Sequence, residues 1–352
     1  MFKRILVPLD GSDRAERAIP VAARLARASG GTVYLLRVAS AAHEYWTPLV
    51  PEAPITLAQE MLDNEMEELE TYLNSVTIYE SLKGLKTEPI AMRGAPAPSI
   101  LSIVDTHHID LIVMCSHGYA GMTRWVMGSV AEKVAHHSIV PVLILREGGS
   151  APAGLHLDVT QPMRVLVPLD GSALARAALA PAAALIAGLS APAQGALHMV
   201  RVIKPLKPLP LKPLLTPEEE EERLNQRNQM LHKARTYLES TSEHLKEGLV
   251  SPDVVEHNPT ITWSVSIDQD VASAIIRVAE NGEDAEGAGV FGRCDVIAMA
   301  THGRGAFQRW AVGSVTERVL NATRLPILVV RPAEIDTIQH TRKIDMTVIP
   351  LF

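Results

Sequence analysis

Two short segments rich in glycine, serine and aspartate each occur twice along the chain. ILVPLDGS at 5–12 returns as VLVPLDGS at 165–172, and DLIVMCSHGYAGMTRWVMGSVAEK at 110–133 returns as DVIAMATHGRGAFQRWAVGSVTER at 295–318. Because both segments keep their order in each half, chance is a poor explanation, and the chain reads as a duplicated α/β domain. Each segment has the pattern of a strand-to-helix turn, which is where open parallel sheets bind ligands.

The second segment spaces its glycines identically in both copies. A glycine is followed by nine residues and then by a Gly-Ser pair: Gly118 with Gly128-Ser129, and Gly303 with Gly313-Ser314. The first glycine follows an apolar strand, where a missing Cβ lets the backbone approach a ligand closely. The serine opens a helix whose free N–H groups and dipole suit an anion. This arrangement favours a cradle of backbone donors around a polyphosphate.

Helix capping is an alternative explanation for the two serines. Ser129 and Glu132, like Ser314 and Glu317, have the spacing of a capping box, which would need no ligand. Capping does not account for the upstream glycines or for the equal nine-residue gap. We therefore favour phosphate binding over capping alone.

Asp10 and Asp170 follow the first strand of each repeat, at the carboxyl edge of the predicted sheet. A carboxylate there can accept hydrogen bonds from a ribose hydroxyl or a base amine, although the same residue type also forms Asx turns. The phosphate segment adds further polar residues in both copies. Their side chains can reach phosphate or remain ordinary loop and surface groups: His117, Arg124, His302 and Arg309.

Composition limits the classes of protein to consider. The chain has 352 residues, of which 47% are hydrophobic and 21% charged, as in soluble globular proteins of two domains. A net charge of −7 argues against non-specific nucleic-acid binding but permits a local basic patch. The cysteines, Cys115 and Cys294, give neither a disulfide framework nor a zinc spacing, which predicts a cytoplasmic protein. We find no signal peptide and no apolar run of about eighteen residues, and expect no membrane partner.

The apolar periodicity predicts alternating strands and helices in each half. This order favours an α/β fold with two tandem, doubly wound, parallel five-stranded sheets. In the first half the expected elements are strands at Arg4–Pro8, Thr32–Val38, Leu85–Met92, Leu111–Cys115 and Val140–Leu145, and helices at Asp13–Ala28, about Leu57–Leu82, Ala97–Asp105 and Ser129–His137. The second half repeats them, with insertions expected as loops at Pro205–Leu215, Thr241–Asn258 and Asn281–Gly292.

The repeats also predict the domain limits. We expect a first domain at 1–147, a linker at 148–162, a second domain at 163–333 and a tail at 334–352. Val140–Leu145 and Leu325–Val330 are short apolar strands at the ends of their repeats. Because unpaired apolar edges find partners, we expect them to pair within the chain, and a homodimer is a further possibility.

The PLDGS and HG-x9-GS motifs together resemble the universal stress protein family in its tandem form, over roughly 2–146 and 163–332. The resemblance implies a site for an adenine nucleotide in each half. The first glycine of the family's phosphate loop is replaced in both copies, by Cys115 and Ala300, and Ala300 with Arg304 keeps the second half closer to the pattern. The implied binding residues are Pro8, Leu9, Asp10, Val38, Cys115, His117, Gly118, Gly128, Ser129 and Val130, then Pro168, Leu169, Asp170, Val202, Ala300, His302, Gly303, Arg304, Gly313, Ser314 and Val315.

The expected function is therefore binding of ATP or another adenine nucleotide, with Mg²⁺ or Mn²⁺ on the phosphates, in stress response or signalling by nucleotide occupancy. Two alternatives stay open: a nucleotide-free scaffold with relic phosphate loops, and a slow ATP hydrolase. We assign no catalytic residue and no protein-held metal. The Walker, G-x-S-x-G and G-x-G-x-x-G patterns are absent, which argues against the enzyme classes that use them.

Overall fold

Each half of the chain contributes five parallel strands to one sheet. The fold comes from a computed structural model, which describes residues 1–39, 55–116, 127–146, 162–190, 193–206, 216–285, 289–301 and 313–332. Within these residues the sheet has ten strands in the order β3-β2-β1-β4-β5-β12-β11-β6-β7-β8. Their bounds are β1 Arg4–Leu9, β2 Thr32–Ala39, β3 Lys86–Arg93, β4 Leu111–Cys115, β5 Val142–Leu145, β6 Arg164–Pro168, β7 Ala196–Ile203, β8 Thr260–Ile267, β11 Val296–Ala300 and β12 Ile327–Val330.

The two halves join through their last strands. β5 and β12 pair antiparallel, with Leu143 opposite Leu328 and Val142 opposite Val329. All four side chains are buried. The prediction that these apolar edges pair with each other is therefore confirmed, and the two sheets expected from the sequence are one continuous sheet.

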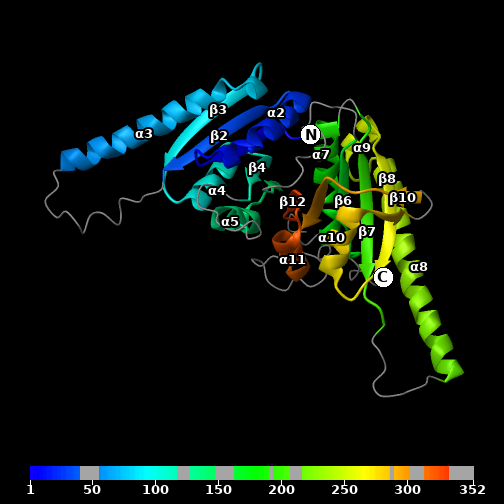
Figure 1. Ribbon diagram of the computed structural model, residues 1–352. Coiled ribbons are helices and arrows are strands. Elements are labelled where there is room, and N and C mark those ends of the chain that lie inside the picture. The colour runs from blue at the N-terminus through cyan, green and yellow to red at the C-terminus, as the bar shows by residue number, and fades with distance from the viewer. Residues whose placement is uncertain are drawn as a thin grey trace, which may run out of the picture.

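Helices cover both faces of the sheet (Figure 1). α2, α3, α7, α8 and α9 pack on one face, and α4, α5, α10 and α11 pack on the other. On each face a hydrophobic core runs across both halves without a break. The bounds are α1 Asp13–Glu16, α2 Ala18–Ser29, α3 Ile55–Thr77, α4 Pro96–Thr106, α5 Ser129–His137, α6 Ala173–Arg176, α7 Leu179–Ser190, α8 Pro217–Lys246, α9 Pro252–His257, α10 Val271–Asn281 and α11 Ser314–Ala322, with a 3₁₀ turn, η2, at Glu80–Leu82.

The expected helix Asp13–Ala28 is two helices, α1 and α2, interrupted at Arg17. Pro20 explains the interruption because it has no N–H to continue an α-helical ladder, although proline is tolerated in a first turn. The second half breaks in the same way between α6 and α7, where Pro181 takes the equivalent place.

Two insertions of the second half have more structure than the loops expected for them. α8 continues to Lys246 and α9 follows at Pro252–His257, so most of the segment Thr241–Asn258 is helical. The segment Asn281–Gly292 contains an antiparallel hairpin of β9 (Glu283–Ala285) and β10 (Gly289–Phe291). The expected loop at 205–215 lies outside the described residues from 207 on, as does the tail from 333.

The helix α7 is buried on nearly all sides. It packs on its own sheet and also contacts α2 of the first half, so ten of its twelve residues are buried. The stretch Ala173–Ser190 consequently has the length and apolar composition of a membrane-spanning helix, with 67% of it buried inside the structure. The expectation that no such stretch exists was wrong, and burial between the two halves explains its composition.

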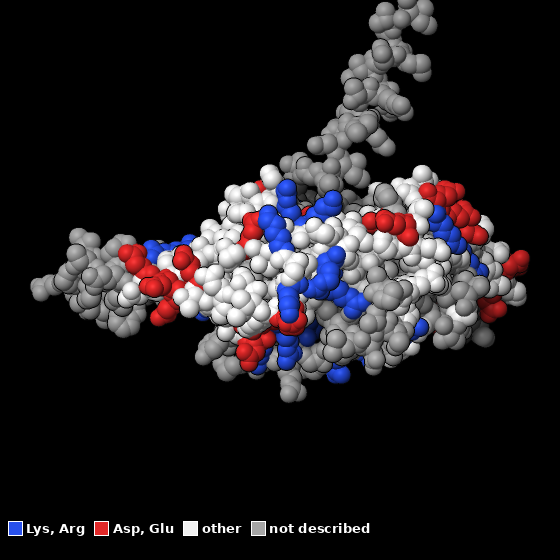
Figure 2. Space-filling model, turned by 90° about the horizontal axis from the view of Figure 1, so that it is seen from above, with Lys and Arg blue, Asp and Glu red and all other residues white. Residues whose placement is uncertain are grey.

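One side of the molecule carries a local basic patch. Viewed from above, blue Lys and Arg side chains gather across the middle of the surface, with red acidic groups beside them and at both ends (Figure 2). The helix α2 carries exposed Arg27 and half-buried Arg24, and exposed Arg17 directly precedes it. A net negative chain thus still has a basic surface, as the sequence permitted.

Candidate nucleotide site

In each half, the predicted site residues that the structure describes lie at the carboxyl edge of the parallel strands. β1 pairs with β4 so that Leu6 lies opposite Ile112, and this register, continued, brings Leu9 beside Cys115. On its other side β1 places Leu9 opposite Arg37, one residue before Val38. The second half repeats the arrangement, with the Leu169 amide donating to the Val200 carbonyl at 2.8 Å. Because β5 and β12 are antiparallel, the two carboxyl edges face opposite ways where the halves meet, and each half has its own candidate site.

Glycine, not serine, caps the helix of the phosphate segment. Gly128 is the N-cap of α5, with φ −64° and ψ 147°, and no side chain caps it. Its amide donates to the Ser116 carbonyl at 2.8 Å, while the Glu132 amide donates to the Gly128 carbonyl at 2.9 Å. Ser129 is the first helical residue and is exposed. The capping box that the sequence allowed is therefore not formed, because the helix starts one residue earlier than a box requires.

The second half has the same geometry at α11. Gly313 is the N-cap, without a capping side chain, and its amide donates to the Thr301 carbonyl at 2.7 Å. A Cβ on Gly313 would lie 3.2 Å from that carbonyl oxygen, so close approach to β11 is one reason for the glycine. Thr316 donates to the Ala300 carbonyl at 2.9 Å and fixes the first turn of α11 against the strand. Ser314 is exposed at the helix start.

Asp10 and Asp170 both take part in local turns. Asp10 Oδ1 accepts hydrogen bonds from the Ser12 amide at 3.0 Å and the Ser12 hydroxyl at 2.6 Å. Asp170 Oδ1 accepts from Ser172 at 2.9 and 2.6 Å. The glycine between them has positive φ in each case, 86° at Gly11 and 87° at Gly171. The Asx turn that the sequence offered as an alternative is thus present, and it holds each aspartate at the edge of the sheet.

Cys115 and Ala300, which replace the first glycine of the family motif, are ordinary strand residues. Among the described residues, positive φ outside glycine occurs only at His108 and Asn258. Cys115 and Ala300 therefore have negative φ, and their Cβ atoms cause no backbone strain. The Cys115 thiol donates to the Arg14 carbonyl at 2.8 Å, and Ala300 is buried. The replacements leave the strand ends intact. Several predicted residues lie outside the described part of the chain: His117, Gly118, Arg124, His302, Gly303, Arg304 and Arg309.

Sequence reasoning missed an arginine–tyrosine stack beside the aspartate loop of each half. Arg37, at the end of β2, lies over the Tyr72 ring of α3 at 4.3 Å from its centroid, and Arg201 lies over the Tyr237 ring of α8 at 5.1 Å. A Cβ on Gly11 would lie 2.8 Å from Arg37 Nη2, so this guanidinium borders the aspartate loop. The repeat was itself a signal, because both halves carry the same pair at matching positions.

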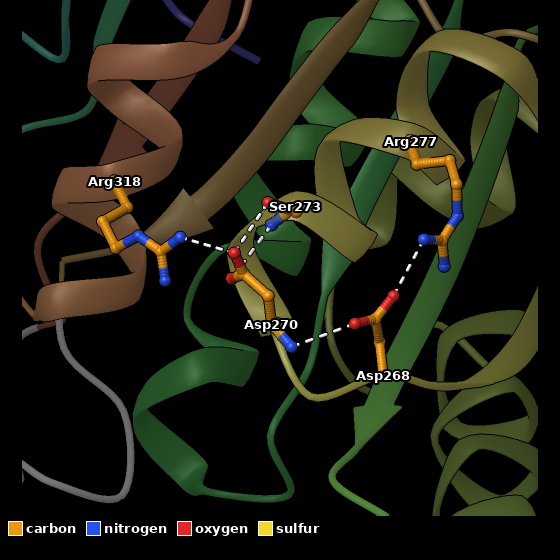
Figure 3. A network of polar contacts seen from close by, with 5 residues as sticks. All are labelled: Asp268, Asp270, Ser273, Arg277 and Arg318. Carbon is orange, nitrogen blue, oxygen red and sulfur yellow. Dashed lines mark hydrogen bonds and ion pairs between the residues drawn. The ribbon is translucent and has the colours of Figure 1, made fainter.

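A polar network ties α10 to α11 in the second half (Figure 3). Asp270 caps α10 by accepting from Ser273, at 3.4 Å from the amide and 2.8 Å from the hydroxyl, and it pairs with Arg318 of α11 at 2.5 Å. The hydrogen bond from Arg318 lowers the pKa of Asp270. Asp268 pairs with Arg277 at 2.8 Å. The first half has Ala95 at the corresponding N-cap, without a side-chain hydrogen bond, so this tie is particular to the second half.

The described side chains offer no ready metal centre. In that part of the chain no group of three or more His, Cys, Asp or Glu residues could hold a metal ion. Glu132 and Glu317 lie in the first turns of α5 and α11 and are exposed.

Comparison with known proteins identifies the family. The profile of the universal stress protein family matches residues 1–146 and 292–331. The chain belongs to this family. It is 31% identical over 148 residues to universal stress protein YxiE of Bacillus subtilis, covering 42% of this chain and all of that protein. It is also 31% identical over 147 residues to universal stress protein MJ0531 of Methanocaldococcus jannaschii, covering 42% of this chain and 84% of that protein.

Two solved structures match nearly the whole chain and show the tandem fold. A universal stress protein from Archaeoglobus fulgidus aligns with a TM-score of 0.58 and 19% identity over 94% of this chain and 98% of that one. A functionally unknown protein from Pseudomonas aeruginosa PAO1 aligns with a TM-score of 0.53 and 14% identity over 94% and 93%. The universal stress fold therefore occurs twice in this chain, as the repeats predicted.

Proposed function

We propose that this tandem universal stress protein binds ATP or another adenine nucleotide at the carboxyl edge of at least one half, and acts in stress response or signalling through nucleotide occupancy. The single observation that carries the proposal is the start of α5 and α11. Each helix begins at a glycine that is hydrogen-bonded to the neighbouring strand end, and no side chain caps it. A helix start of this kind leaves backbone N–H groups available to phosphate oxygens.

The positions of the other edge residues support the same ligand. Asp10 and Asp170 are held at the ends of their first strands, one strand away from the helix start in each half. Val38 and Val202 are half-buried at the ends of the second strands and offer apolar surface for a base. A polar group for the ribose, an apolar wall and a helix start thus recur in the same order in both halves.

A solved universal stress protein in complex with cAMP covers 41% of this chain at 23% identity, with a TM-score of 0.30. That complex describes the ligand of that protein alone. The proposal for this chain depends on its own residues, and includes Mg²⁺ or Mn²⁺ bound through the phosphates and a cytoplasmic location.

The two halves are separate candidates. Ala300 and Arg304 favour the second half, and the Asp270–Arg318 tie gives α11 a support that α5 lacks. The family profile, however, follows the first half along its whole length and the second half only from residue 292. The proposal therefore requires binding in at least one half and leaves the choice to measurement.

The first test is whether the protein carries a nucleotide. The purified chain is denatured, and mass spectrometry identifies any released nucleotide. ATP affinity is then measured for Gly128→Val, Gly313→Val and the double variant, with Ser102→Val on the exposed face of α4 as a matched control. The φ and ψ values at both glycines suit valine, but a Cβ on Gly313 would lie 3.2 Å from the Thr301 carbonyl oxygen. The melting temperature of each variant is therefore measured as well, and loss of ATP affinity in a variant that stays folded at the assay temperature would support the site.

The opposite result has a clear meaning. If the wild-type chain releases no nucleotide and the double variant binds ATP as wild type does, the phosphate loops are relics. The protein would then act as a scaffold.

A further inference from the structure

The stacked tyrosine of the first half has an acidic partner. The Tyr72 hydroxyl donates to Glu16 Oε1 at 2.8 Å, and the Tyr79 hydroxyl donates to Glu16 Oε2 at 2.9 Å. Burial and the hydrogen bond to Glu16 raise the pKa of Tyr72, so the tyrosine stays a neutral donor. Glu16 is the last residue of α1. The first half thus supplies its own carboxylate beside the Arg37–Tyr72 stack.

The second half has an arginine where the first half has this glutamate. The offset of 160 residues that relates Asp10 to Asp170 relates Glu16 to Arg176, the last residue of α6. A guanidinium has donors only and cannot accept the tyrosine proton. The charge at this position changes from −1 to +1, beside a stack that already holds Arg201.

The Tyr237 hydroxyl is left without a hydrogen bond. It is buried and has no partner among the groups that the structure describes. The hydroxyl of Thr241 donates instead to the Tyr237 carbonyl at 2.7 Å. Burial raises the pKa of Tyr237, while Arg176 and the neighbouring Thr241 hydroxyl lower it in part, although Thr241 does not meet hydrogen-bond geometry with the Tyr237 hydroxyl. A buried donor without an acceptor costs free energy, on the order of 1–3 kcal/mol.

Asp170 is the nearby carboxylate to consider as an internal acceptor. It is close enough to raise the pKa of Tyr237. Its Oδ1 accepts from the Ser172 amide and hydroxyl, and it makes no hydrogen bond to the tyrosine. Compared with the first half, the second half therefore lacks the carboxylate of Glu16 beside its tyrosine and has a second cation, Arg176, in addition to Arg201.

We propose that the second half binds a small oxyanion, a phosphate or carboxylate group, between the Tyr237 hydroxyl and the Arg176 guanidinium. The anion takes the place that the Glu16 carboxylate has in the first half. Hydrogen bonds of this kind, to a charged acceptor, are stronger than those between neutral groups. The site adjoins Asp170 of the proposed nucleotide site, but its donors come from α6 and α8 and not from the start of α11, where the phosphates of a nucleotide would bind.

Charge-swap variants test the proposal. Thermal unfolding is followed in sodium chloride, sodium phosphate and sodium acetate at equal ionic strength. We expect the wild-type melting temperature to rise in phosphate, acetate or both, which also distinguishes the two anions. Arg176→Glu installs the first-half residue and should remove the rise without lowering the melting temperature in chloride. Tyr237→Phe should lose most of the rise. The exposed Lys233→Glu makes the same charge change elsewhere and should keep it.

The mirror variant and a nucleotide-site variant complete the test. Glu16→Arg should lower the melting temperature in chloride and enlarge the rise with anions, because it creates the same arrangement in the first half. Gly313→Val removes phosphate binding at α11 and should leave the rise intact. The proposal would be overturned if the melting temperature of Arg176→Glu rose with anions as much as that of the wild type. It would also be overturned if Gly313→Val abolished the rise. An unchanged wild-type melting temperature in all three salts would overturn it as well, because a bound anion stabilises the folded state.

Discussion

Leu25 of α2 occupies the space that a side chain on Gly188 of α7 would need. A Cβ on Gly188 would lie 2.6 Å from Leu25 Cδ2 and 3.7 Å from Leu25 Cα. The two residues belong to different halves of the chain and are both buried. A missing side chain at one position therefore lets the two repeats pack their first long helices against each other.

The first prediction concerns this contact. Gly188→Ala should change stability little, because the higher helix propensity of alanine offsets a clash with the mobile end of a leucine. Gly188→Val adds branched bulk and should destabilise the protein by about 1–3 kcal/mol. Leu25→Ala in the same chain should recover part of that loss, although it is destabilising alone. Chemical denaturation of the four variants measures the coupling; additive effects would show that the helices do not meet here.

The second prediction is a pH dependence due to His198. This residue of β7 is fully buried, and its ring nitrogens hydrogen-bond with Thr262 Oγ1 at 2.8 Å and Ser264 Oγ at 2.9 Å, both on β8. Burial lowers the pKa of His198 to about 4, whereas an unfolded histidine titrates near 6.5. Between these values the unfolded chain binds a proton that the folded chain does not. The contribution to stability is therefore complete above about pH 6.5 and declines as the pH falls through 4.

The measurement compares wild type with His198→Gln, which keeps polar atoms and removes the titration. The free energy of unfolding of wild type should fall more between pH 7 and pH 4, by an excess on the order of 3 kcal/mol or less. Equal pH profiles for the two proteins would show that His198 is solvated or already protonated. The first half has Tyr34 at the equivalent position, so the effect should arise in the second half alone.

The third prediction concerns the Asp270–Arg318 pair. Asp270→Asn should lower the melting temperature at neutral pH, because the ionised carboxylate both caps α10 and binds Arg318. The pKa of Asp270 is lowered in the folded state, so its contribution is complete above the pKa of an unfolded aspartate and is lost on acidification below it. The variant and wild type should therefore converge at low pH. A gap that persists in acid would assign the effect to something other than the charge.

Matched substitutions make this test specific to the second half. Arg318→Gln should lower the melting temperature in the same direction, and adding it to Asp270→Asn should cost little more. Lys133→Gln removes the corresponding cation of the first half, where Ala95 offers it no carboxylate. The melting temperature of that variant should therefore equal that of the wild type.

Much of the fold was predictable because most elements occur in both repeats, so the apolar pattern of each one could be compared between two copies. The bounds of β4 and α5 agree with their prediction from apolar periodicity, and the pairing of β5 with β12 followed from two short apolar edges. The segment around Pro252 was misread as a loop because of its polar residues. Pro252 is the first residue of α9, a position that proline favours, so a signal for the helix was present.

The site was less predictable because backbone geometry decides details that spacing cannot. Ser129 and Glu132 have the spacing of a capping box, but the N-cap is Gly128, one residue before the serine that a box would need there. Arg37 and Tyr72 are 35 residues apart in the sequence, on β2 and α3, and their stacking depends on how α3 crosses the sheet. Even so, each of these pairs has a counterpart in the other half. A search for repeated polar residues outside the known motifs would have found Arg201 and Tyr237.

The last prediction is that any ATP hydrolysis is slow. Fast phosphoryl transfer needs a group that positions the nucleophile, together with cations that neutralise charge on the transferred phosphoryl. At the start of α5 and α11 the described residues offer backbone donors and an exposed serine, while Glu132 and Glu317 point from an exposed first turn. Such an edge can hold ATP more readily than it can stabilise a transition state. Turnover should be far below the roughly 1–100 per second typical of kinases. Steady-state phosphate release by the wild type, with the Gly128→Val/Gly313→Val double variant as control, measures it. Kinase-range turnover that the double variant abolishes would make this protein an enzyme.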